Sequence, residues 1–159
     1  MDSKNEKLLD DTGWRLLSEL QKNARISFTE LGQRVGLTSP AVADRVRRME
    51  EAGIISGYHT KVNLAKIGLP IMAIVRLAEI GGQSCERAAA QVSQIEEVIE
   101  CIRVTGDDSM VVKVVASSVD HLTQVLDQLS KYGIPNTSIA RSRPMVRSVM
   151  TSNMLMETE

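Results

Sequence analysis

The chain has 159 residues, of which 43% are hydrophobic and 25% are charged, a balance typical of one medium-sized folded domain or two small ones. Its 19 basic and 20 acidic side chains give a net charge of -1, which excludes a globally polybasic protein but not a local basic patch. No apolar run approaches the roughly 20 residues that span a bilayer, and the polar start MDSKNEKLLDD does not resemble a secretory leader. We therefore expect a cytoplasmic protein with no membrane partner.

Three short helices are predicted before residue 53, over residues 12–22, 29–35 and 40–52, because apolar side chains recur there at three- and four-residue spacings. Gly36 and Gly53 stand where the second and third helices should end, since glycine readily adopts the left-handed conformation beyond a helix C-terminus. The short connection between the second and third helices indicates a helix-turn-helix.

The third predicted helix has two different faces. Thr38 and Ser39 are candidate N-caps, and Pro40 suits the first turn, where its missing N–H would have no partner within the helix. Apolar residues at one face point to a core, and an exposed face carries arginines. The inward residues are Val42, Val46 and Met49. The outward residues are Ala41, Asp44, Arg45 and Arg48, with Arg47 beside them.

The exposed face of this helix is suited to DNA. The major groove is about 12 Å wide and admits one α-helix, whose N-terminal residues reach the base edges. Arg45 and Arg48 would contact phosphates or guanine, because the guanidinium fork matches paired acceptors. Arg25 and Arg34 would add phosphate contacts. The alternative is an ordinary solvated basic face, but the helix-turn-helix context favours DNA. The predicted DNA-binding set is Arg25, Arg34, Ser39, Pro40, Ala41, Asp44, Arg45, Arg47 and Arg48.

The remainder of the chain predicts a small hairpin and then an α+β domain. The segment IISGYHTKV after Gly53 is typical of a short hairpin or wing that closes the small domain, and residues 63–70 form a connector. Strands and helices then follow in the order β-α-β-β-α-β, which is the split arrangement of ferredoxin-like domains. The predicted elements span residues 71–79, 84–94, 98–105, 110–116, 118–133 and 137–149.

A ferredoxin-like sheet carries both of its helices on one face. The other face would remain uncovered, and an apolar sheet face of that size is unfavourable in water. We therefore expect this chain to form at least a dimer.

Several motifs in the first third of the chain are specific: NARIS between the first two helices, the run LGQRVGLT, the third helix SPAVADRVRRMEEAGII, and GY at the start of the wing. Together they make the stretch from Leu8 to Tyr58 closely resemble the Lrp/AsnC family of bacterial and archaeal regulators. The likeness extends over nearly the whole chain, although residues 71–149 match more by pattern than by identical residues. It implies a DNA-binding transcriptional regulator that forms dimers, commonly octamers, and responds to amino acids.

With that resemblance, the chain divides into four parts. Residues 1–62 are the winged helix-turn-helix domain, residues 63–70 the connector, residues 71–150 the ferredoxin-like domain for oligomerisation and effector binding, and residues 151–159 a tail. The methionine-rich tail either packs on a neighbouring subunit or is disordered.

The resemblance also places the effector region at the turn after the second sheet strand, formed by Thr105, Gly106, Asp107, Asp108 and Ser109. Backbone N–H groups exposed at Gly106 would hold the carboxylate of an amino acid, and Asp107 or Asp108 would accept from its ammonium group. Without the family, an ordinary hairpin turn is the simpler interpretation.

The sequence departs from the family pattern at two places. At Asp108 and Ser109 the family often has an aromatic and then an acidic residue. At Gly13 the family usually has an acidic residue, and glycine there costs up to about 1 kcal/mol of helix propensity.

No catalytic or metal constellation is recognisable in the sequence. The two cysteines form no CxxC pair, the two histidines lack companions at ligand spacing, and no nucleophile stands beside a base. We expect a non-enzyme without metal or cofactor, with small buried thiols in a reducing compartment. The main alternative function is an architectural protein that wraps or bridges DNA without responding to any ligand.

Overall fold

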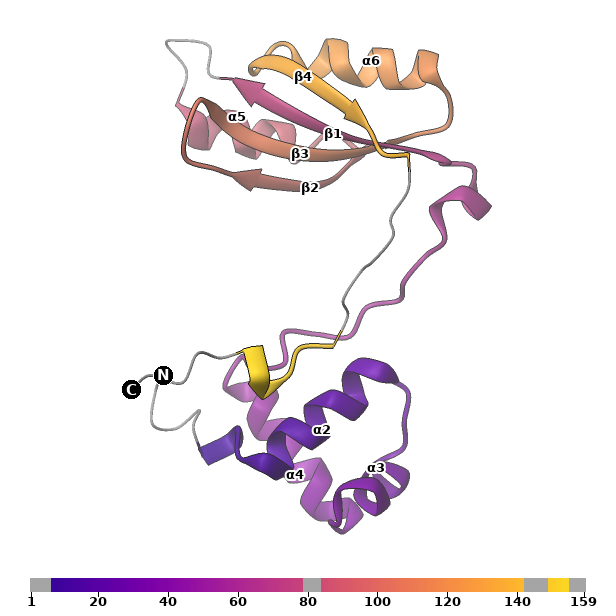
Figure 1. The fold of residues 1–159 in the computed structure, drawn as a ribbon, viewed down its shortest axis with the longest axis vertical. Coiled ribbons are helices and arrows are strands. Elements are labelled where there is room, and N and C mark those ends of the chain that lie inside the picture. The colour runs from indigo at the N-terminus through magenta and orange to yellow at the C-terminus, as the bar shows by residue number, and fades with distance from the viewer. Residues whose placement is uncertain (1–6, 79–83, 142–148, 155–159) are drawn as a thin grey trace. The chain divides into compact units, whose positions relative to one another are not determined.

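The computed structural model describes residues 7–78, 84–141 and 149–154. Contacts divide the chain into two compact units (Figure 1): residues 1–60 with 145–159 form the first, and residues 61–144 form the second. We call them the helical unit and the sheet unit. The described residues 149–154 thus belong with the N-terminal part of the chain. None of the helices in the described ranges is long and apolar enough to cross a membrane.

The helical unit is built from α2 (Asp11–Lys22), α3 (Phe28–Val35) and α4 (Ser39–Glu51), each within one residue of the predicted bounds. The side chains of Asp10 and Ser27 cap α2 and α3 by accepting from backbone N–H groups at 2.8 and 3.2 Å. One apolar stripe from each helix is buried in a common core, as the periodicity predicted. The members of this core are Leu16, Leu20, Ile26, Leu31, Val35, Val42 and Val46.

Gly13 allows a close approach of the backbone in this unit. A Cβ atom at this position would lie 1.9 Å from the carbonyl oxygen of Leu8 and 3.1 Å from the Cε of Met49, which is fully buried. The cost of glycine in helix propensity is therefore secondary, because no larger side chain fits between the start of α2 and α4.

The segment after α4 was predicted to be a short hairpin or wing, and it does not form the paired strands of a hairpin. Residues 54–63 contain no strand. The N–H groups of Ile54 and Ile55 instead donate to the carbonyl oxygen of Met49 at 2.9 and 3.1 Å, and the Tyr58 hydroxyl donates to Glu50 at 2.8 Å. The segment is therefore anchored to the end of α4, which leaves its backbone without a strand partner.

The sheet unit has the predicted β-α-β-β-α-β order and confirms the α+β fold. Its elements are β1 (Ile71–Ala78), α5 (Cys85–Val92), β2 (Val98–Arg103), β3 (Asp108–Ala116), α6 (Val119–Leu129) and β4 (Ile134–Ile139). The four strands lie in the order β2-β3-β1-β4, and every neighbouring pair is antiparallel. A 3-10 helix, Leu64–Ile67, precedes the sheet within the predicted connector.

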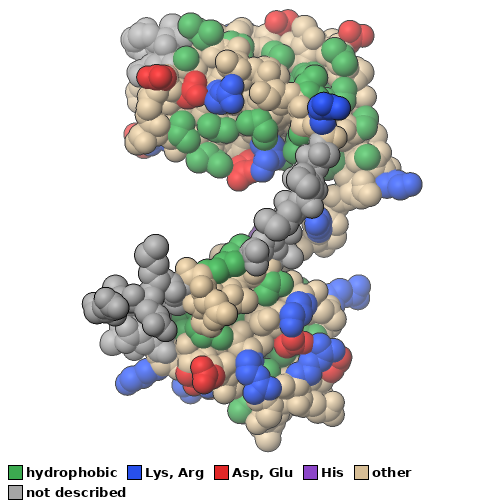
Figure 2. All heavy atoms as spheres, viewed as in Figure 1, with side chains coloured by type: hydrophobic (Ala, Val, Ile, Leu, Met, Phe, Trp, Pro, Cys, Tyr) green, Lys and Arg blue, Asp and Glu red, His purple; other side chains and the backbone are tan. Residues whose placement is uncertain are grey.

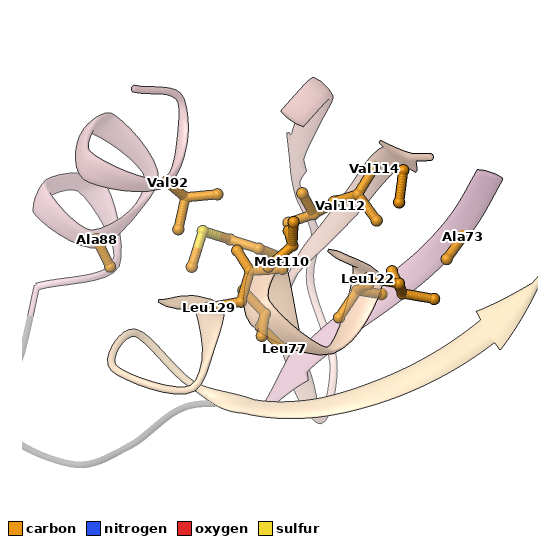
Figure 3. Close-up of a cluster of buried hydrophobic side chains, with 12 residues drawn as sticks. Ala73, Leu77, Ala88, Val92, Met110, Val112, Val114, Leu122 and Leu129 are labelled. Carbon is orange, nitrogen blue, oxygen red and sulfur yellow. The ribbon is translucent and has the colours of Figure 1, made fainter. Parts of the chain in front are cut away.

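Both helices of this unit cover the same face of the sheet. Alternate residues of β1 and β3 point to that face, in keeping with the two-residue period of a strand, and meet apolar residues of α5 and α6 (Figure 3). The fully buried strand residues include Ala73, Val75, Leu77, Met110, Val112 and Val114. The opposite face has no helix among the described residues of this unit.

The last strand begins earlier than predicted. The prediction places Pro135 at the end of the preceding helix, before the strand, but Pro135 lies inside β4 and is paired with Leu77 of β1. The strand order places β4 at an edge of the sheet, where a residue without an N–H can be tolerated. The predicted strand continued to residue 149, but β4 ends at Ile139 and residues 140, 141 and 149 are not in a strand. Residues 142–148 lie outside the described part of the chain.

Candidate DNA-binding and effector sites

The turn between α3 and α4 sets the direction of the second helix. Gly36 has φ 79° and its N–H donates to the carbonyl oxygen of Gly32 at 2.8 Å, while the N–H of Leu37 donates to the same oxygen at 2.9 Å. A Cβ on Gly32 would lie 2.4 Å from the carbonyl oxygen of Leu37. Two glycines therefore allow the sharp turn of a helix-turn-helix.

The beginning of α4 is accessible. Pro40 and Ala41 are exposed, and Ser39 is half-buried. The side chain of the N-cap residue, Thr38, makes no capping hydrogen bond, so the first backbone N–H groups of α4 are open to an anion. These are the positions predicted to reach the edges of the bases.

Arg47 and Arg48 share an acidic partner on the exposed side of α4. Arg48 lies 2.8 Å from one oxygen of Asp44, and Arg47 lies 2.9 Å from the other and 2.9 Å from Glu51. The hydrogen bond from Arg47, assisted by the charge of Arg48, lowers the pKa of the Asp44 carboxyl. Both arginines are about 60% exposed. Because exposed ion pairs contribute only about 0–1 kcal/mol, a phosphate can replace Asp44 at little cost.

Arg45 lies in a different environment from the other two arginines of α4. Its side chain is only 23% exposed, and its guanidinium pairs with the carboxylate of Asp10 and lies 3.5 Å from the carbonyl oxygen of Lys7. Its Nε is buried with no partner among the described residues. In this arrangement Arg45 joins α4 to the N-cap of α2, and it is not among the exposed arginines of the helix.

Arg25 and Arg34 lie on different parts of the helical unit. Arg25 is exposed in the turn between α2 and α3, where its N–H donates to Asn23 at 3.0 Å. The Arg34 guanidinium pairs with Glu19 and, at 2.6 Å, with Glu30. It therefore connects α2 and α3. Figure 2 shows how closely basic and acidic side chains alternate on the visible face of this unit.

The Asp10–Arg45 pair predicts how stability varies with pH. The hydrogen bond from Arg45, followed by that from the Gly13 N–H, holds the pKa of the Asp10 carboxyl below its usual range. A lowered folded-state pKa contributes stability above the unfolded value of about 3.9 and loses it as pH falls through the folded value. We expect Asp10→Asn to lower the Tm at pH 7 and the difference from wild type to vanish in acid.

Thermal unfolding of both proteins between pH 7 and pH 2.5 measures this difference. Asp11→Asn removes a charge from the same helical turn and serves as the control. A Tm difference that stays constant throughout the acid range would contradict the assignment to the ion pair.

The predicted effector turn divides into two parts. Thr105, Gly106 and Asp107 are exposed, and Gly106 has φ 117°, a conformation that favours glycine. Asp108 and Ser109 already belong to β3. The Ser109 hydroxyl donates to the carbonyl oxygen of Leu77 at 2.9 Å, so this side chain helps to hold β3 against β1. The structure thus brings all five residues together, with the first three at the surface.

A cation that sequence reasoning missed lies beside this turn. The Nε of Arg76 in β1 is 3.8 Å from a carboxylate oxygen of Asp108, and its Nη2 donates to Asn136 of β4 at 3.0 Å. The signal was available as the one charge in the otherwise apolar run IMAIVRLA. Arg76 and Asp108 place opposite charges side by side, as recognition of a zwitterion requires.

The sheet face without helices is mixed in character. Its apolar members include Met72 and Ile74 of β1, Val111 of β3, Ile102 of β2 and Ile134 of β4, as the registers establish. Charged side chains interrupt them, among them Arg76 and the pair Lys113–Glu100. Ile102 and Ile134 are 47% and 64% exposed. Figure 2 shows hydrophobic side chains over the visible face of this unit with charged groups between them.

The cysteines and histidines form no metal site among the described residues, where no group of three suitable ligands occurs. Cys85 and Cys101 are partly buried against the core of the sheet unit, and burial raises the pKa of the Cys101 thiol. His121 lies 2.9 Å from a carboxylate oxygen of Glu97. These groups are most simply explained as structural.

Comparison with known proteins gives two matching family models. A model described as winged helix-turn-helix DNA-binding matches residues 9–56, and one described as Lrp/AsnC ligand binding domain matches residues 72–155. The HTH-type transcriptional regulator YezC of Bacillus subtilis is 37% identical over 134 residues, covering 84% of this chain and 94% of that protein.

Two solved structures have the same fold. The feast or famine regulatory protein Rv3291c of Mycobacterium tuberculosis, complexed with L-methionine, has a TM-score of 0.81 and 30% identity, over 87% of this chain and 95% of that one. The regulator NMB0573 of Neisseria meningitidis, also a complex with L-methionine, has a TM-score of 0.84 and 24% identity, over 92% and 99% of the two chains.

Proposed function

This chain belongs to the Lrp/AsnC family of transcriptional regulators, and we propose that it binds double-stranded DNA through α4 and responds to an amino acid bound at the 105–109 turn. The observation that carries the first part is the pair Arg47 and Arg48, both exposed on α4 and held by weak surface ion pairs. Its relatives are transcriptional regulators by name, which supports a non-enzymatic role.

The proposed DNA contacts follow from the geometry of the helical unit. The first turn of α4 enters the major groove, where Ser39, Pro40 and Ala41 face the base edges. Arg47 and Arg48 leave Asp44 for phosphates or guanine acceptors, because charge-assisted hydrogen bonds to phosphate are stronger than exposed ion pairs. Arg25 and Arg34 remain candidates for phosphate contacts at the periphery. Arg45 contributes by holding α4 on α2.

The proposed effector contacts combine the predicted turn with Arg76. The ammonium group of an amino acid is accepted by Asp107 or Asp108, and its carboxylate by Arg76 or by N–H groups near Gly106. The L-methionine complexes of two similar structures support an amino acid as the ligand. The sequence departs from the family pattern at Asp108 and Ser109. This departure then changes which amino-acid side chain the site accepts, because the Ser109 hydroxyl is already hydrogen-bonded to the carbonyl oxygen of Leu77.

We further propose that the uncovered sheet face joins two chains. Burial of its apolar side chains offsets the loss of freedom on association, and its charged groups provide pairing across the interface. The sequence assigns DNA binding to residues 1–62, a connector to residues 63–70, assembly and effector binding to residues 71–150, and a tail to residues 151–159. We keep this assignment except for residues 149 and 150, which lie with the helical unit.

Asp108→Asn tests the effector site. We expect DNA affinity without ligand to remain within about twofold of wild type, as for a surface change, and the change of DNA affinity on adding L-methionine to disappear. Light scattering during a titration with DNA measures the mass of the protein assembly and its affinity for DNA in one experiment. Asp127→Asn, on α6, is the control.

The titration has two contrary outcomes. A normal response in both Asp108→Asn and Asp107→Asn would place the ligand elsewhere. If no amino acid in a panel changes affinity or mass in wild type while DNA still binds cooperatively, the ligand-independent architectural role replaces the sensor. A measured mass equal to that of a single chain would contradict the proposed dimer.

A further inference from the structure

A groove runs along the helical unit between α2 and the segment after α4. Its volume is about 450 Å³, and its floor is apolar. The side chains of Trp14, Leu17 and Leu20 line it from α2, and Ile54 and Ile55 line it from the other side. These residues belong to one unit, so the groove exists independently of the sheet unit.

The chain's own C-terminal residues lie at this groove. Met150 contributes to its lining, and the side-chain amide of Gln21 pairs with both backbone groups of Met150. The Met150 N–H donates to Oε1 at 2.8 Å, and Nε2 donates to the Met150 carbonyl oxygen at 3.0 Å. The short 3-10 helix η2 (Ser152–Met154) follows directly (Figure 1).

We propose that residues 149–154 of the same chain, which we call the C-terminal strap, dock on α2 through Gln21, so that Met150 forms part of the wall of this groove. A primary amide that satisfies both the N–H and the C=O of one residue reproduces the pairing of a β-bridge, so Gln21 holds backbone as a neighbouring strand would. The strap sequence VMTSNM is uncharged, in keeping with an apolar floor. Methionine adapts to an irregular apolar surface better than a branched side chain.

The polar chemistry of the groove argues against a small-molecule ligand as its occupant. The Gln21 amide is already used by Met150 and by the carbonyl oxygen of Leu17, 3.2 Å away. Met150 remains 50% exposed, so the strap lies at the rim of the groove. Deleting the strap should therefore leave the buried core of the helical unit intact.

Docking of the strap has a topological consequence. The chain leaves the helical unit after Thr60 and returns to it from residue 145, so two crossings rather than one join the units. The strap contacts α2 and the groove whose other wall, residues 54–59, is tied to α4 by the Tyr58–Glu50 hydrogen bond. The strap therefore contacts the helical unit that is proposed to bind DNA, a consequence that rests on the proposed function.

The single tryptophan of the chain provides the readout, because Trp14 lines the groove. We compare the full chain with one ending at residue 148, which lacks the strap, and one ending at residue 154, which keeps it. Deletion of the strap should move Trp14 emission to longer wavelength, steepen its quenching by acrylamide and lower the Tm. The chain ending at residue 154 should behave like the full chain. Unchanged emission and quenching after deletion would overturn the proposal.

A full-length variant tests the same contact without truncation, in case the chain ending at residue 148 does not fold. Gln21→Met keeps the length of the side chain and removes the amide, so the Trp14 emission should move in the same direction by a smaller amount. Gln33→Met, an exposed glutamine of α3, is the matched control. Equal behaviour of the two variants would mean that the Gln21 amide does not hold the strap, which would also overturn the proposal.

A mixing experiment establishes which chain provides the strap that docks beside the groove. The chain ending at residue 148 is refolded together with full-length Trp14→Phe chains, so that emission comes only from grooves lacking their own strap. Docking within one chain predicts the long-wavelength emission of the deleted chain. Recovery of the wild-type emission would show that a second copy donates the strap and would overturn docking within the chain. None of these readouts requires DNA or an effector, so their failure is distinct from failure of the proposed function.

Discussion

Gly13→Ala is expected to destabilise the helical unit more than either Asp10→Asn or Arg45→Ala. The added Cβ would lie 1.9 Å from the Leu8 carbonyl oxygen, and that atom is backbone rather than the end of a flexible side chain. Relief requires α2 to move away from the chain that precedes it and from fully buried Met49. Overpacked sites usually cost about 1–3 kcal/mol and sometimes more, and a backbone clash belongs at the upper end. The gain in helix propensity, up to about 1 kcal/mol, opposes only part of this.

Urea unfolding followed by Trp14 emission measures the free energy of unfolding of the helical unit. We expect a loss of roughly 3 kcal/mol, with Ser18→Ala in the same helix close to wild type. If Gly13→Ala is as stable as wild type or more stable, the gain in helix propensity outweighs the clash, and the backbone at Leu8 moves away without a loss of stability.

Arg48→Ala should produce the largest loss of DNA affinity. The side chain is 60% exposed, and its ion-pair partner, Asp44, retains Arg47 after the change, so the fold should be unaffected. A bidentate contact to guanine is worth about 1–3 kcal/mol, equivalent to an affinity loss of about 5- to 150-fold. That loss should fall on one position of the binding site. A phosphate contact would instead weaken all sequences alike and reduce the salt slope by about one.

Binding isotherms on a promoter fragment and on unrelated DNA, each at several salt concentrations, separate these two contacts. Arg87→Ala, an exposed arginine of α5, controls for the change of charge. Unchanged binding by Arg48→Ala on both DNAs would remove α4 from the interface.

Arg45→Ala provides the contrast to Arg48→Ala. The sequence places Arg45 on the same helical face as Arg48, but the structure pairs it with Asp10 and leaves it 23% exposed. We therefore assign its main contribution to the stability of the helical unit. The two arginines are three residues apart, and only one of them remains available to DNA in this arrangement.

The sequence alone determined the fold class, the three N-terminal helices and the order of strands and helices in the sheet unit. These properties depend on local patterns: the 3.6-residue period of α2 to α4, the N-cap position at Thr38, the two-residue period of β1 and β3, and the turn at Gly36. The boundaries of the N-terminal helices agree to one residue because caps and glycines mark them. The β-α-β-β-α-β order then leaves few ways to form a sheet with both helices on one face.

Only the tertiary structure decided what each side chain meets. Arg45 contacts Asp10 from 35 residues away, Arg76 contacts Asp108 across two strands, and Gln21 contacts Met150 from 129 residues away. Gly13 allows an approach between segments that no pattern brings together, and Ile54 and Ile55 give their N–H groups to α4 instead of forming a hairpin. Periodicity specifies which face of an element is apolar, but it does not specify the partner in space, because that depends on how distant segments pack around one core.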